Sequence, residues 1–337
     1  MARPLTAASR ASLRSLAETA FSRPHGFADT ALRATNLHEP CFRVPSEAKT
    51  ALRRLGLRAL GHSSEVILLL DGPVGTELLR RGVPTPLPAW SADAIASAPD
   101  VLAAIHADYA ASGAQVHTTN TFRTRPRTMG AAWEEAARRA AAIARSAVPE
   151  GHRIAGSIAP IEDCYRPDLS PGRAARGEHR ALARVLADAG VDLLLCETFP
   201  HVDEACVAVE EAVATGLPTW VSLTPGPEAD LLTPGALAEG LARAVDAGAV
   251  AVLVNCVPAS RARAYVEAIA DRALGVPIGV YANAGHVDEA MGWAHVDEPE
   301  AGSRYLTHAR EWVGAGATIV GGCCGTGPAH VRALLDL

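Results

Sequence analysis

Two adjacent cysteines near the end of the printed chain have the clearest capacity for chemistry. Cys323 and Cys324 lie in GGCCGTGP, residues 321–328, in a chain with only seven cysteines, and Cys256 ends the segment VLVNC. Three thiolates can supply three corners of a tetrahedral metal site and leave the fourth to a substrate, and soft sulfur ligands favour zinc over magnesium. The surrounding glycines let the backbone turn so that both sulfur atoms of the pair face one point. Packing as small hydrophobic side chains, or a redox pair, are the alternatives.

Four polar residues could bind a substrate, and they lie in or after short apolar runs. Glu197 follows DLLLC directly, Thr119 belongs to the hydroxyl-rich segment HTTNTF, and Asn283 lies in YANAG. Asp71 ends the run VILLLD, where it could also cap a following helix. The twelve histidines show neither the HxxxH nor the HExxH spacing of helical zinc ligands, so we expect them at the surface or packed between helices.

These residues need elements to position them, and from residue 66 onward the sequence repeats a strand followed by a helix. Each unit has a β-branched or leucine-rich run, a turn and an alanine-rich amphipathic segment, and several segments close on a glycine that suits a helix C-cap. The eight predicted strands are Val66–Asp71, Val116–Thr119, Ile154–Ile158, Asp192–Cys196, Thr219–Leu223, Val250–Asn255, Pro277–Tyr281 and Thr318–Val320. Eight such units in about 270 residues predict an α/β fold, the (β/α)8 TIM barrel. The alternative is a doubly wound open sheet, which usually has a GxGxxG loop where this chain has DGPVGTE.

A barrel would bring the candidate residues together, because its active site lies at the carboxyl ends of the strands. Asp71 would follow the first strand, Thr119 the second and Glu197 the fourth. Asn283 would follow the seventh strand, and the three cysteines would follow the sixth and the eighth. The sequence therefore predicts one site that combines thiols with carboxylates and hydroxyls.

Residues 1–60 fit no strand–helix unit and differ in charge from the rest. They carry ten Lys and Arg against four Asp and Glu, whereas residues 61–337 carry 21 against 33. We expect residues 1–60 to be a poorly ordered or loosely docked extension, with an Arg- and Ser-rich composition that faintly resembles a transit peptide. Residues 61–337 are expected to form the barrel domain, whose negative charge makes it a poor candidate for binding nucleic acid.

Apolar runs and cysteine usage indicate the compartment. The longest apolar run, VILLL, is far shorter than the roughly 20 residues that span a bilayer. An odd number of cysteines in a long chain argues against a secreted disulfide framework. We therefore expect a cytoplasmic protein without a membrane partner. Cys41, Cys164, Cys196 and Cys206 are expected to be packing residues.

Six segments, in order along the chain, resemble the homocysteine S-methyltransferase family. They are LLLDGPVGTELLRRG, HADYAASGAQVHTTNTFRT, ETFPHVDEA, LVNCV, YANAG and GGCCGTGPAHVRAL, and the resemblance covers the chain from about residue 66 onward. It implies a zinc barrel like those of betaine-homocysteine methyltransferase and of the front of cobalamin-dependent methionine synthase. By this resemblance Cys256, Cys323 and Cys324 would hold Zn²⁺. The thiol of homocysteine would take the open position, where coordination removes its proton.

The resemblance also implies roles for the four polar residues. Glu197 would hold the amino group of homocysteine, Asp71 would help to form the amino-acid pocket, and Thr119 would contact the substrate. Asn283 would lie near the metal and occupy the fourth position when substrate is absent. One departure is DGPVGTE, since the family more often has glycine in place of Pro73, whose fixed φ and missing N–H alter the loop.

Expectations about the methyl donor rest on chain organisation and composition. No further folate or cobalamin domain follows the barrel, which favours a small donor, S-methylmethionine or S-adenosylmethionine. Betaine comes second, because quaternary ammonium groups favour aromatic faces and the chain is only 4% aromatic. A corrinoid protein as donor, and another thiol or a selenol as acceptor, are further alternatives. Trp90 in PAWSADAI could line the donor site or anchor a loop, the expected partners are small molecules, and a homo-oligomer is left open.

Overall fold

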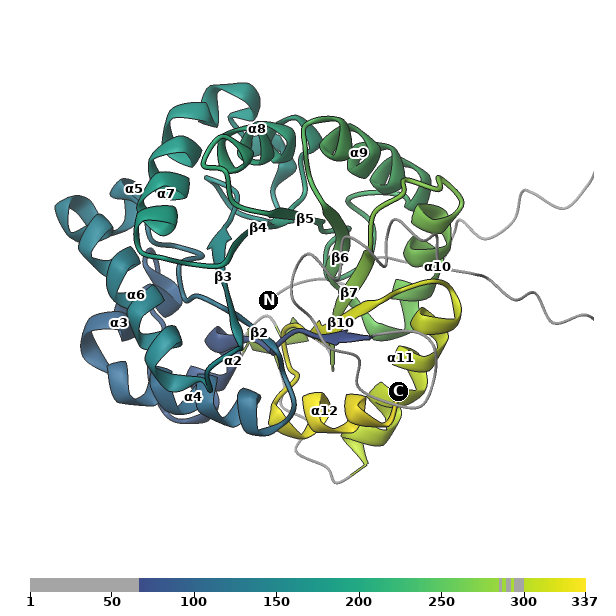
Figure 1. The fold of residues 1–337 in the computed structure, drawn as a ribbon, viewed down its shortest axis with the longest axis horizontal. Coiled ribbons are helices and arrows are strands. Elements are labelled where there is room, and N and C mark those ends of the chain that lie inside the picture. Colours follow the sequence, from purple (N-terminus) through teal and green to yellow (C-terminus); the bar gives the residue numbers. More distant parts are fainter. Residues whose placement is uncertain (1–66, 285–286, 289–291, 294–299) are drawn as a thin grey trace, which may run out of the picture. The chain divides into compact units, whose positions relative to one another are not determined.

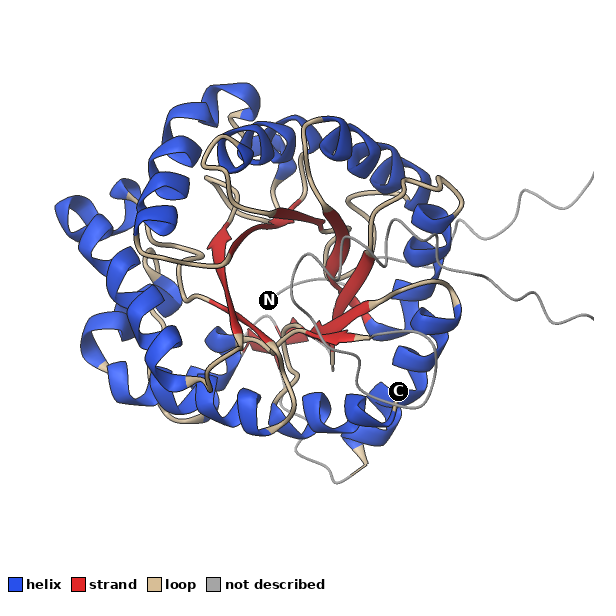
Figure 2. Ribbon diagram, viewed as in Figure 1, coloured by secondary structure: helices blue, strands red, loops and turns tan. Residues whose placement is uncertain are grey.

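Eight parallel strands surrounded by helices form the body of the protein (Figure 1 and Figure 2). The structure is a computed structural model that describes residues 67–284, 287–288, 292–293 and 300–337. The strands are β1 (Leu68–Leu69), β2 (Val116–Thr118), β3 (Arg153–Ile158), β4 (Leu193–Phe199), β5 (Thr219–Leu223), β6 (Ala251–Pro258), β7 (Ile278–Asn283) and β10 (Ile319–Gly322). The predicted (β/α)8 barrel is confirmed.

Contacts between the first two strands close the barrel. The sheet order is β1-β10-β7-β6-β5-β4-β3-β2, so β1 and β2 stand at its two ends. Leu70, just after β1, forms a parallel bridge with Val116 of β2, and the N–H of Asp71 donates to the carbonyl of Val116 at 3.0 Å. Each strand therefore has two neighbours, and the carboxyl ends of all eight strands meet at one rim.

The boundaries of the first strand differ from the prediction. The ladder covers only Leu68–Leu69, followed by the bridge at Leu70, whereas Val66–Asp71 was expected. Val66 lies outside the described residues. Asp71 lies beyond the bridge, but its backbone N–H and carbonyl still bond to Val116 and Gly322, and its side chain accepts from Thr118.

Four other strands, β4, β6, β7 and β10, run past their predicted ends, and β4 and β6 do so at irregularities. The register of β4 against β5 shifts after Cys196, and the register of β6 against β7 shifts after Asn255. A bulge of this kind turns a side chain toward a new direction and leaves no signal in an apolar run. Glu197 and Cys256 lie at these two irregularities, so both are within strands rather than after them.

Helices cover the outside of the barrel, as the alanine-rich segments predict. They are α2 (Val74–Arg80), α3 (Ala94–Ser97), α4 (Pro99–Ala111), α5 (Pro126–Met129), α6 (Trp133–Ala147), α7 (Arg176–Asp188), α8 (Val202–Val213), α9 (Pro234–Asp246), α10 (Ala259–Ala270), α11 (Ala301–Gly314) and α12 (Pro328–Ala333). Proline begins α4, α9 and α12, where the missing N–H costs no hydrogen bond. Gly248 after α9 and Gly316 after α11 have φ of 107° and 112°, which ends a helix at little steric cost.

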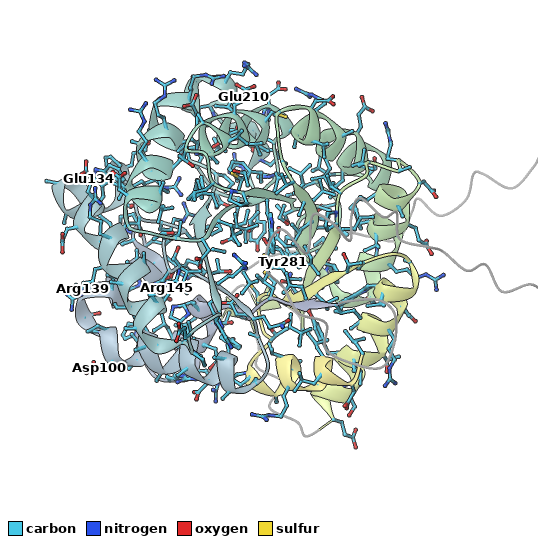
Figure 3. The ribbon with its side chains drawn as sticks, viewed as in Figure 1. Asp100, Glu134, Arg139, Arg145, Glu210 and Tyr281 are labelled. Carbon is cyan, nitrogen blue, oxygen red and sulfur yellow. The ribbon has the colours of Figure 1, made fainter. Side chains whose placement is uncertain are left out.

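Two apolar layers follow from the alternation of side chains along the strands. Leu193 and Leu195 of β4 point into the barrel with Trp220 of β5, which is fully buried. Leu194 and Cys196 point outward and pack against the helices. Side chains fill the interior of the ring of strands, where Figure 3 labels Tyr281. The barrel is therefore a packed core, and space for a ligand is confined to its rim.

A short hairpin follows β7 and precedes α11 in the sequence. Its strands, β8 (Val287–Asp288) and β9 (Gly292–Trp293), pair antiparallel, and the strand–helix repeat did not predict them. No helix in the part of the chain that the structure describes is long and apolar enough to cross a membrane. The expectation of an extension over residues 1–60 lies outside the described residues.

Candidate active site

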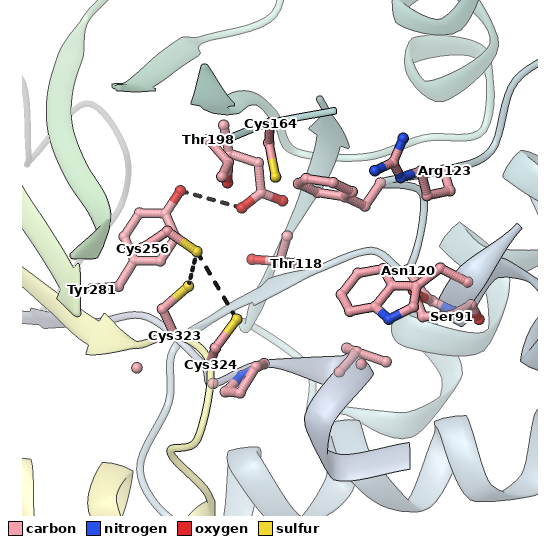
Figure 4. Close-up of a pocket in the computed structure, with 18 of the residues that line it drawn as sticks. Ser91, Thr118, Asn120, Arg123, Cys164, Thr198, Cys256, Tyr281, Cys323 and Cys324 are labelled. Carbon is pink, nitrogen blue, oxygen red and sulfur yellow. Dashed lines mark hydrogen bonds between the residues drawn. The ribbon is translucent and has the colours of Figure 1, made fainter. Parts of the chain in front are cut away.

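Three thiols meet at the carboxyl rim of the barrel. Cys256 lies at the irregularity of β6, and Cys323 and Cys324 follow the end of β10. The Sγ of Cys256 is 3.1 Å from the Sγ of Cys323 and 3.9 Å from that of Cys324 (Figure 4). A tetrahedral zinc with Zn–S bonds of about 2.3 Å would hold neighbouring sulfur atoms roughly 3.8 Å apart. The group therefore has the ligand type and the size that suit one metal ion.

The pKa shifts of these thiols explain why a cation would stabilise the three cysteines. The hydrogen bond with Cys323 raises the pKa of Cys256 well above its usual value, and the same bond lowers the pKa of Cys323. One thiolate therefore opposes ionisation of the next, because the site is buried and the charges are close. A divalent cation among the three sulfur atoms would remove this opposition.

Close packing of glycines positions the cysteine pair. A Cβ at Gly322 would overlap the side chain of Thr326, so any larger residue there would push the loop outward. The hydroxyl of Thr326 donates to the carbonyl of Cys323 at 2.8 Å, and the N–H of Cys323 donates to the carbonyl of Ala282 at 2.9 Å. These bonds fix the direction in which the loop leaves β10.

Two non-glycine residues at the rim have a left-handed backbone. Cys256 has φ of 52° and Thr198 has φ of 63°, a conformation that is uncommon for such residues and persists where the surroundings enforce it. The side-chain amide of Asn255 donates to the hydroxyl of Thr198 at 2.7 Å, and its oxygen accepts from the hydroxyl of Ser222 at 2.7 Å. This buried network connects the irregularities of β4 and β6, which carry Glu197 and Cys256.

Two buried carboxyl groups lie beside the thiols. One oxygen of Glu197 accepts from the hydroxyl of Ser157 at 2.5 Å, and the other accepts from the hydroxyl of Tyr281 at 3.2 Å. Burial raises the pKa of Glu197 to about 7, although these hydrogen bonds oppose the rise. Burial also raises the pKa of Asp71 well above its usual value, against hydrogen bonds from the N–H and hydroxyl of Thr118. Both groups would gain from an ammonium group that replaces the lost water.

The structure distinguishes among the other predicted polar residues. The alternative of Asp71 as a helix cap is wrong, because α2 follows Pro73 without any side-chain cap. Thr119 lines the pocket, and its hydroxyl accepts from the N–H of Ser157 at 3.0 Å. Asn283 is buried at the end of β7 but is not among the pocket-lining residues, and its side-chain amide has no hydrogen-bond partner among the described residues.

Three residues that touch the candidate groups were missed in the sequence. Ser157 and Tyr281 bind Glu197, and the hydroxyl of Tyr165 lies 3.3 Å from the Sγ of Cys256. The inward alternation of β3 and β7 could have indicated Ser157 and Tyr281 as polar residues that face the barrel interior. Tyr165 lies in the loop after β3, where no periodic pattern exists to indicate its direction.

One pocket, with a volume of about 320 Å³, joins these groups at the rim. The three cysteines, Glu197 and Asp71 line it together with aromatic rings. Trp90 and Phe122 pack edge to face there, with ring centroids 5.8 Å apart. Trp90 therefore lines the pocket, and its role at the donor site stays a prediction.

A cluster of three buried polar side chains includes Asp71 of this pocket and two histidines. One ligand atom from each of Asp71, His106 and His117 lies within 4.8 Å of the other two. Burial lowers the pKa of His106 to about 4 and that of His117 to about 3, so both rings are neutral near pH 7. His106 on α4 and His117 on β2 pack where helix meets sheet, which agrees with the packing expectation for histidines rather than the surface one.

The fold and the site together define a class of barrel enzyme. Its rim carries three cysteines whose spacing suits a metal ion, and two buried carboxyl groups line the same pocket. The family model described as homocysteine S-methyltransferase matches residues 68–337. This chain therefore belongs to the homocysteine S-methyltransferase family, and it is a methyltransferase enzyme. The resemblance in the sequence is confirmed.

Individual relatives support the same assignment. The homocysteine S-methyltransferase of Escherichia coli K12 is 30% identical over an alignment of 316 residues that covers 82% of this chain and 97% of the relative. The S-methylmethionine–homocysteine S-methyltransferase BHMT2 of Mus musculus is 30% identical, over 73% of this chain and 72% of its own. The crystal structure of the metallated form of the homocysteine methyltransferase MmuM from Escherichia coli has a TM-score of 0.68 and 26% identity, covering 81% of this chain and 96% of MmuM.

Proposed function

We propose that this protein transfers a methyl group from S-methylmethionine to the thiol of homocysteine, so that both molecules become methionine. The observation that carries the proposal is the meeting of three thiols and the buried Glu197 in one pocket of a barrel of this family. The relatives named for S-methylmethionine support this donor.

Cys256, Cys323 and Cys324 would hold a zinc ion. Their sulfur spacing suits tetrahedral coordination, and the related MmuM has been crystallised in a metallated form. A zinc ion held there would supply the acidity that keeps the thiol of a bound homocysteine deprotonated near neutral pH. Displacement at a methyl carbon needs no acid or base, which agrees with a pocket whose described lining residues include no histidine.

The acidic pocket would bind the amino-acid end of homocysteine. The carboxylate of Glu197 would accept the ammonium group, with Ser157 and Tyr281 holding its two oxygens in place. Asp71 would complete this wall, fixed by Thr118. These contacts would orient the substrate sulfur toward the cysteines.

Thr119 and Asn283 have the weaker geometric support. Thr119 lines the pocket, and its hydroxyl, which also bonds to Ser157 and Thr121, would touch the substrate. Asn283 ends β7, which lies between the strands that carry Cys256 and Cys323, and its amide would be a reserve ligand when homocysteine is absent.

The size of the pocket favours a small donor. A volume of about 320 Å³ is at the lower end of the range of ligand pockets, and it must hold donor and acceptor together. Two small amino acids suit this space better than homocysteine with an adenosyl donor. During transfer the bond from the methyl carbon to the sulfonium sulfur breaks and leaves its electron pair there. The homocysteine thiolate forms the new carbon–sulfur bond, and the thiol proton leaves to solvent.

A donor panel tests the proposal. Purified enzyme is given homocysteine with S-methylmethionine, S-adenosylmethionine, betaine or methyltetrahydrofolate, and methionine is measured. We expect S-methylmethionine to exceed each other donor by at least about tenfold, equivalent to about 1.4 kcal/mol. Selenocysteine is an added acceptor, since a selenocysteine methyltransferase of Astragalus bisulcatus is 27% identical over 322 residues. No turnover with any donor, or methylation of selenocysteine alone, contradicts the proposal.

We further propose that residues 61–337 are the catalytic unit, that residues 1–60 are a dispensable extension, and that the enzyme acts in the cytoplasm on small molecules. The family match at 68–337 and the free state of the six described cysteines support this division and a reducing compartment. A chain that begins at residue 61 should keep the full-length activity and metal content. Loss of folding on this truncation would contradict the boundary.

A further inference from the structure

The lining of the pocket includes one positive and one negative side chain that do not pair with each other. Arg123 and Asp163 both line the pocket, from the loops after β2 and β3. The half-buried Arg123 forms no ion pair and no side-chain hydrogen bond with any residue that the structure describes. One oxygen of Asp163 accepts the N–H of Tyr165 at 2.8 Å, and the carboxylate is exposed. Both charges are therefore available to a ligand.

Buried polar contacts hold the two loops in place. The guanidinium of Arg125 is buried and donates to the carbonyl of Phe122 at 2.5 Å and to that of Pro160, so it ties one loop to the other. The carboxylate of Glu204 on α8 accepts from the N–H of Ile161 at 2.7 Å. The segments that carry Arg123 and Asp163 are thus fixed relative to the barrel before any ligand binds.

Aromatic rings lie next to Arg123 in the pocket. The guanidinium of Arg123 lies over the ring of Phe122, 5.8 Å from its centroid, and Phe122 packs against Trp90. In Figure 4 Arg123 lies across the pocket from the three cysteines. The pocket therefore combines sulfur ligands, aromatic rings and two opposite charges, with Arg123 on the side away from the cysteines.

We propose that Arg123 and Asp163 form a subsite for the α-carboxylate and the α-ammonium group of an amino-acid sulfonium donor. This inference rests on the proposed function and deepens it, because it names what selects the donor. Arg123 binds the carboxylate, Asp163 binds the ammonium group, and the sulfonium lies by the aromatic rings with its methyl group toward the thiols. A methyl sulfonium without an amino-acid end, or betaine with its short spacer, would not engage both ends of the pocket.

The acceptor has a different set of partners, which argues against Arg123 as its anchor. Glu197 and Asp71 lie beside the thiols and offer only negative charge, so they suit the ammonium group of a homocysteine whose sulfur is at the cysteines. The guanidinium of Arg123 lies over the ring of Phe122, and among the described residues it forms an ion pair with neither carboxylate. Glu197 and Asp71 would therefore bind the amino-acid group of homocysteine, and Arg123 and Asp163 would bind that of the donor.

Paired changes in enzyme and donor test the subsite. The donors are S-methylmethionine and (3-aminopropyl)dimethylsulfonium, which lacks the carboxylate, and the enzymes are wild type, Arg123→Met and Arg123→Lys. For Arg123→Met we expect the KM for S-methylmethionine to rise at least about tenfold, since a charge-assisted hydrogen bond is lost. Its KM for homocysteine and its metal content should stay at wild-type values. The preference for the donor with a carboxylate should vanish, and Arg123→Lys should restore part of it.

Asp163 and a matched arginine complete the experiment. Asp163→Asn should reduce the preference for S-methylmethionine over 4-(dimethylsulfonio)butyrate, which has the same spacer but no ammonium group, by roughly two- to fivefold, because an exposed charge pair contributes little. Arg127 is the control, since it follows in the same segment but pairs with Glu162 and Glu178 outside the pocket. Arg127→Met should leave the KM for both donors unchanged.

The possible failures are distinguishable. If wild type uses S-methylmethionine and Arg123→Met keeps its carboxylate preference, the subsite is wrong and the proposed function stands. If Arg123→Met raises the KM for homocysteine instead, Arg123 serves the acceptor and the inference is overturned. If wild type shows no turnover with S-methylmethionine, the proposed donor fails and the subsite fails with it.

Discussion

The sulfur atoms of Cys256 and Cys323 lie 3.1 Å apart although 67 positions separate them in the sequence. β6 and β10 carry these residues, and β7 lies between them in the sheet. A left-handed backbone at Cys256 and the glycines that end β10 before Cys323 direct both side chains across the end of β7. The cysteines therefore come together only because the barrel closes, and no single segment of the sequence contains the site.

Loss of one thiol should remove the metal and the activity together. Purified wild type is expected to contain about one zinc per chain, as a site with three cysteine ligands and one open position would. Cys323→Ala should lower zinc content close to zero and kcat/KM by at least about a hundredfold, because two ligands bind far more weakly than three. Metal analysis by mass spectrometry and methionine formation are the two measurements.

A cysteine outside the group provides the control for that experiment. Cys206 lies on α8, away from the pocket lining, so Cys206→Ala should keep both zinc and activity. Removal of metal by a chelator should abolish activity in wild type, and added zinc should restore it. Full activity in metal-free protein would refute a catalytic metal.

Glu197 should recognise the amino group of homocysteine. Glu197→Gln keeps the size of the side chain but loses the charge, so kcat/KM for homocysteine should fall by about tenfold to a hundredfold. With 4-mercaptobutyrate, which has no amino group, wild type and variant should differ little. Equal losses with both thiols would show that Glu197 acts on the sulfur or the fold instead.

Activity at low pH should depend on the hydroxyl groups that bind Glu197. Burial raises the pKa of this carboxyl group to about 7, and the Ser157 hydroxyl opposes the rise. The carboxylate form binds an ammonium group, so kcat/KM for homocysteine should fall as the pH drops through this pKa. In Ser157→Ala the carboxylate loses a donor, its pKa rises, and the acid limb of the profile should move to higher pH. An unchanged limb would indicate that another group controls it.

Buried neutral histidines should make the protein sensitive to acid. The pKa of His106 is about 4 in the folded protein, whereas an unfolded histidine has about 6.5, so the unfolded state binds more protons between these values. Stability contributed by His106 is present above pH 6.5 and falls as the pH drops toward 4, by up to about 3 kcal/mol. His106→Gln should lose less stability than wild type over this range, as measured by urea unfolding at pH 7 and pH 4.5. Parallel losses in the two proteins would exclude His106 as a cause.

Much of the fold could be predicted because its signal is local and repeated. Each strand is a short apolar run and each helix an amphipathic segment, and eight repeats leave few ways to close a sheet. The irregularities in β4 and β6 could not be predicted, because they depend on how Thr198, Asn255 and Ser222 pack across strands. The same limit applies to Tyr165, which reaches Cys256 from a loop.

The sequence by itself determined the barrel, the family and the types of residue at the rim, since periodicity and short motifs are written in consecutive positions. Only the tertiary structure decided which of these residues share a pocket and what their neighbours do to them. It turned Asp71 to Thr118 instead of a helix end, and it placed Arg123 and Asp163 in the pocket without a common ion pair. The physical reason is that distance, burial and hydrogen bonding arise between strands and loops that are far apart along the chain.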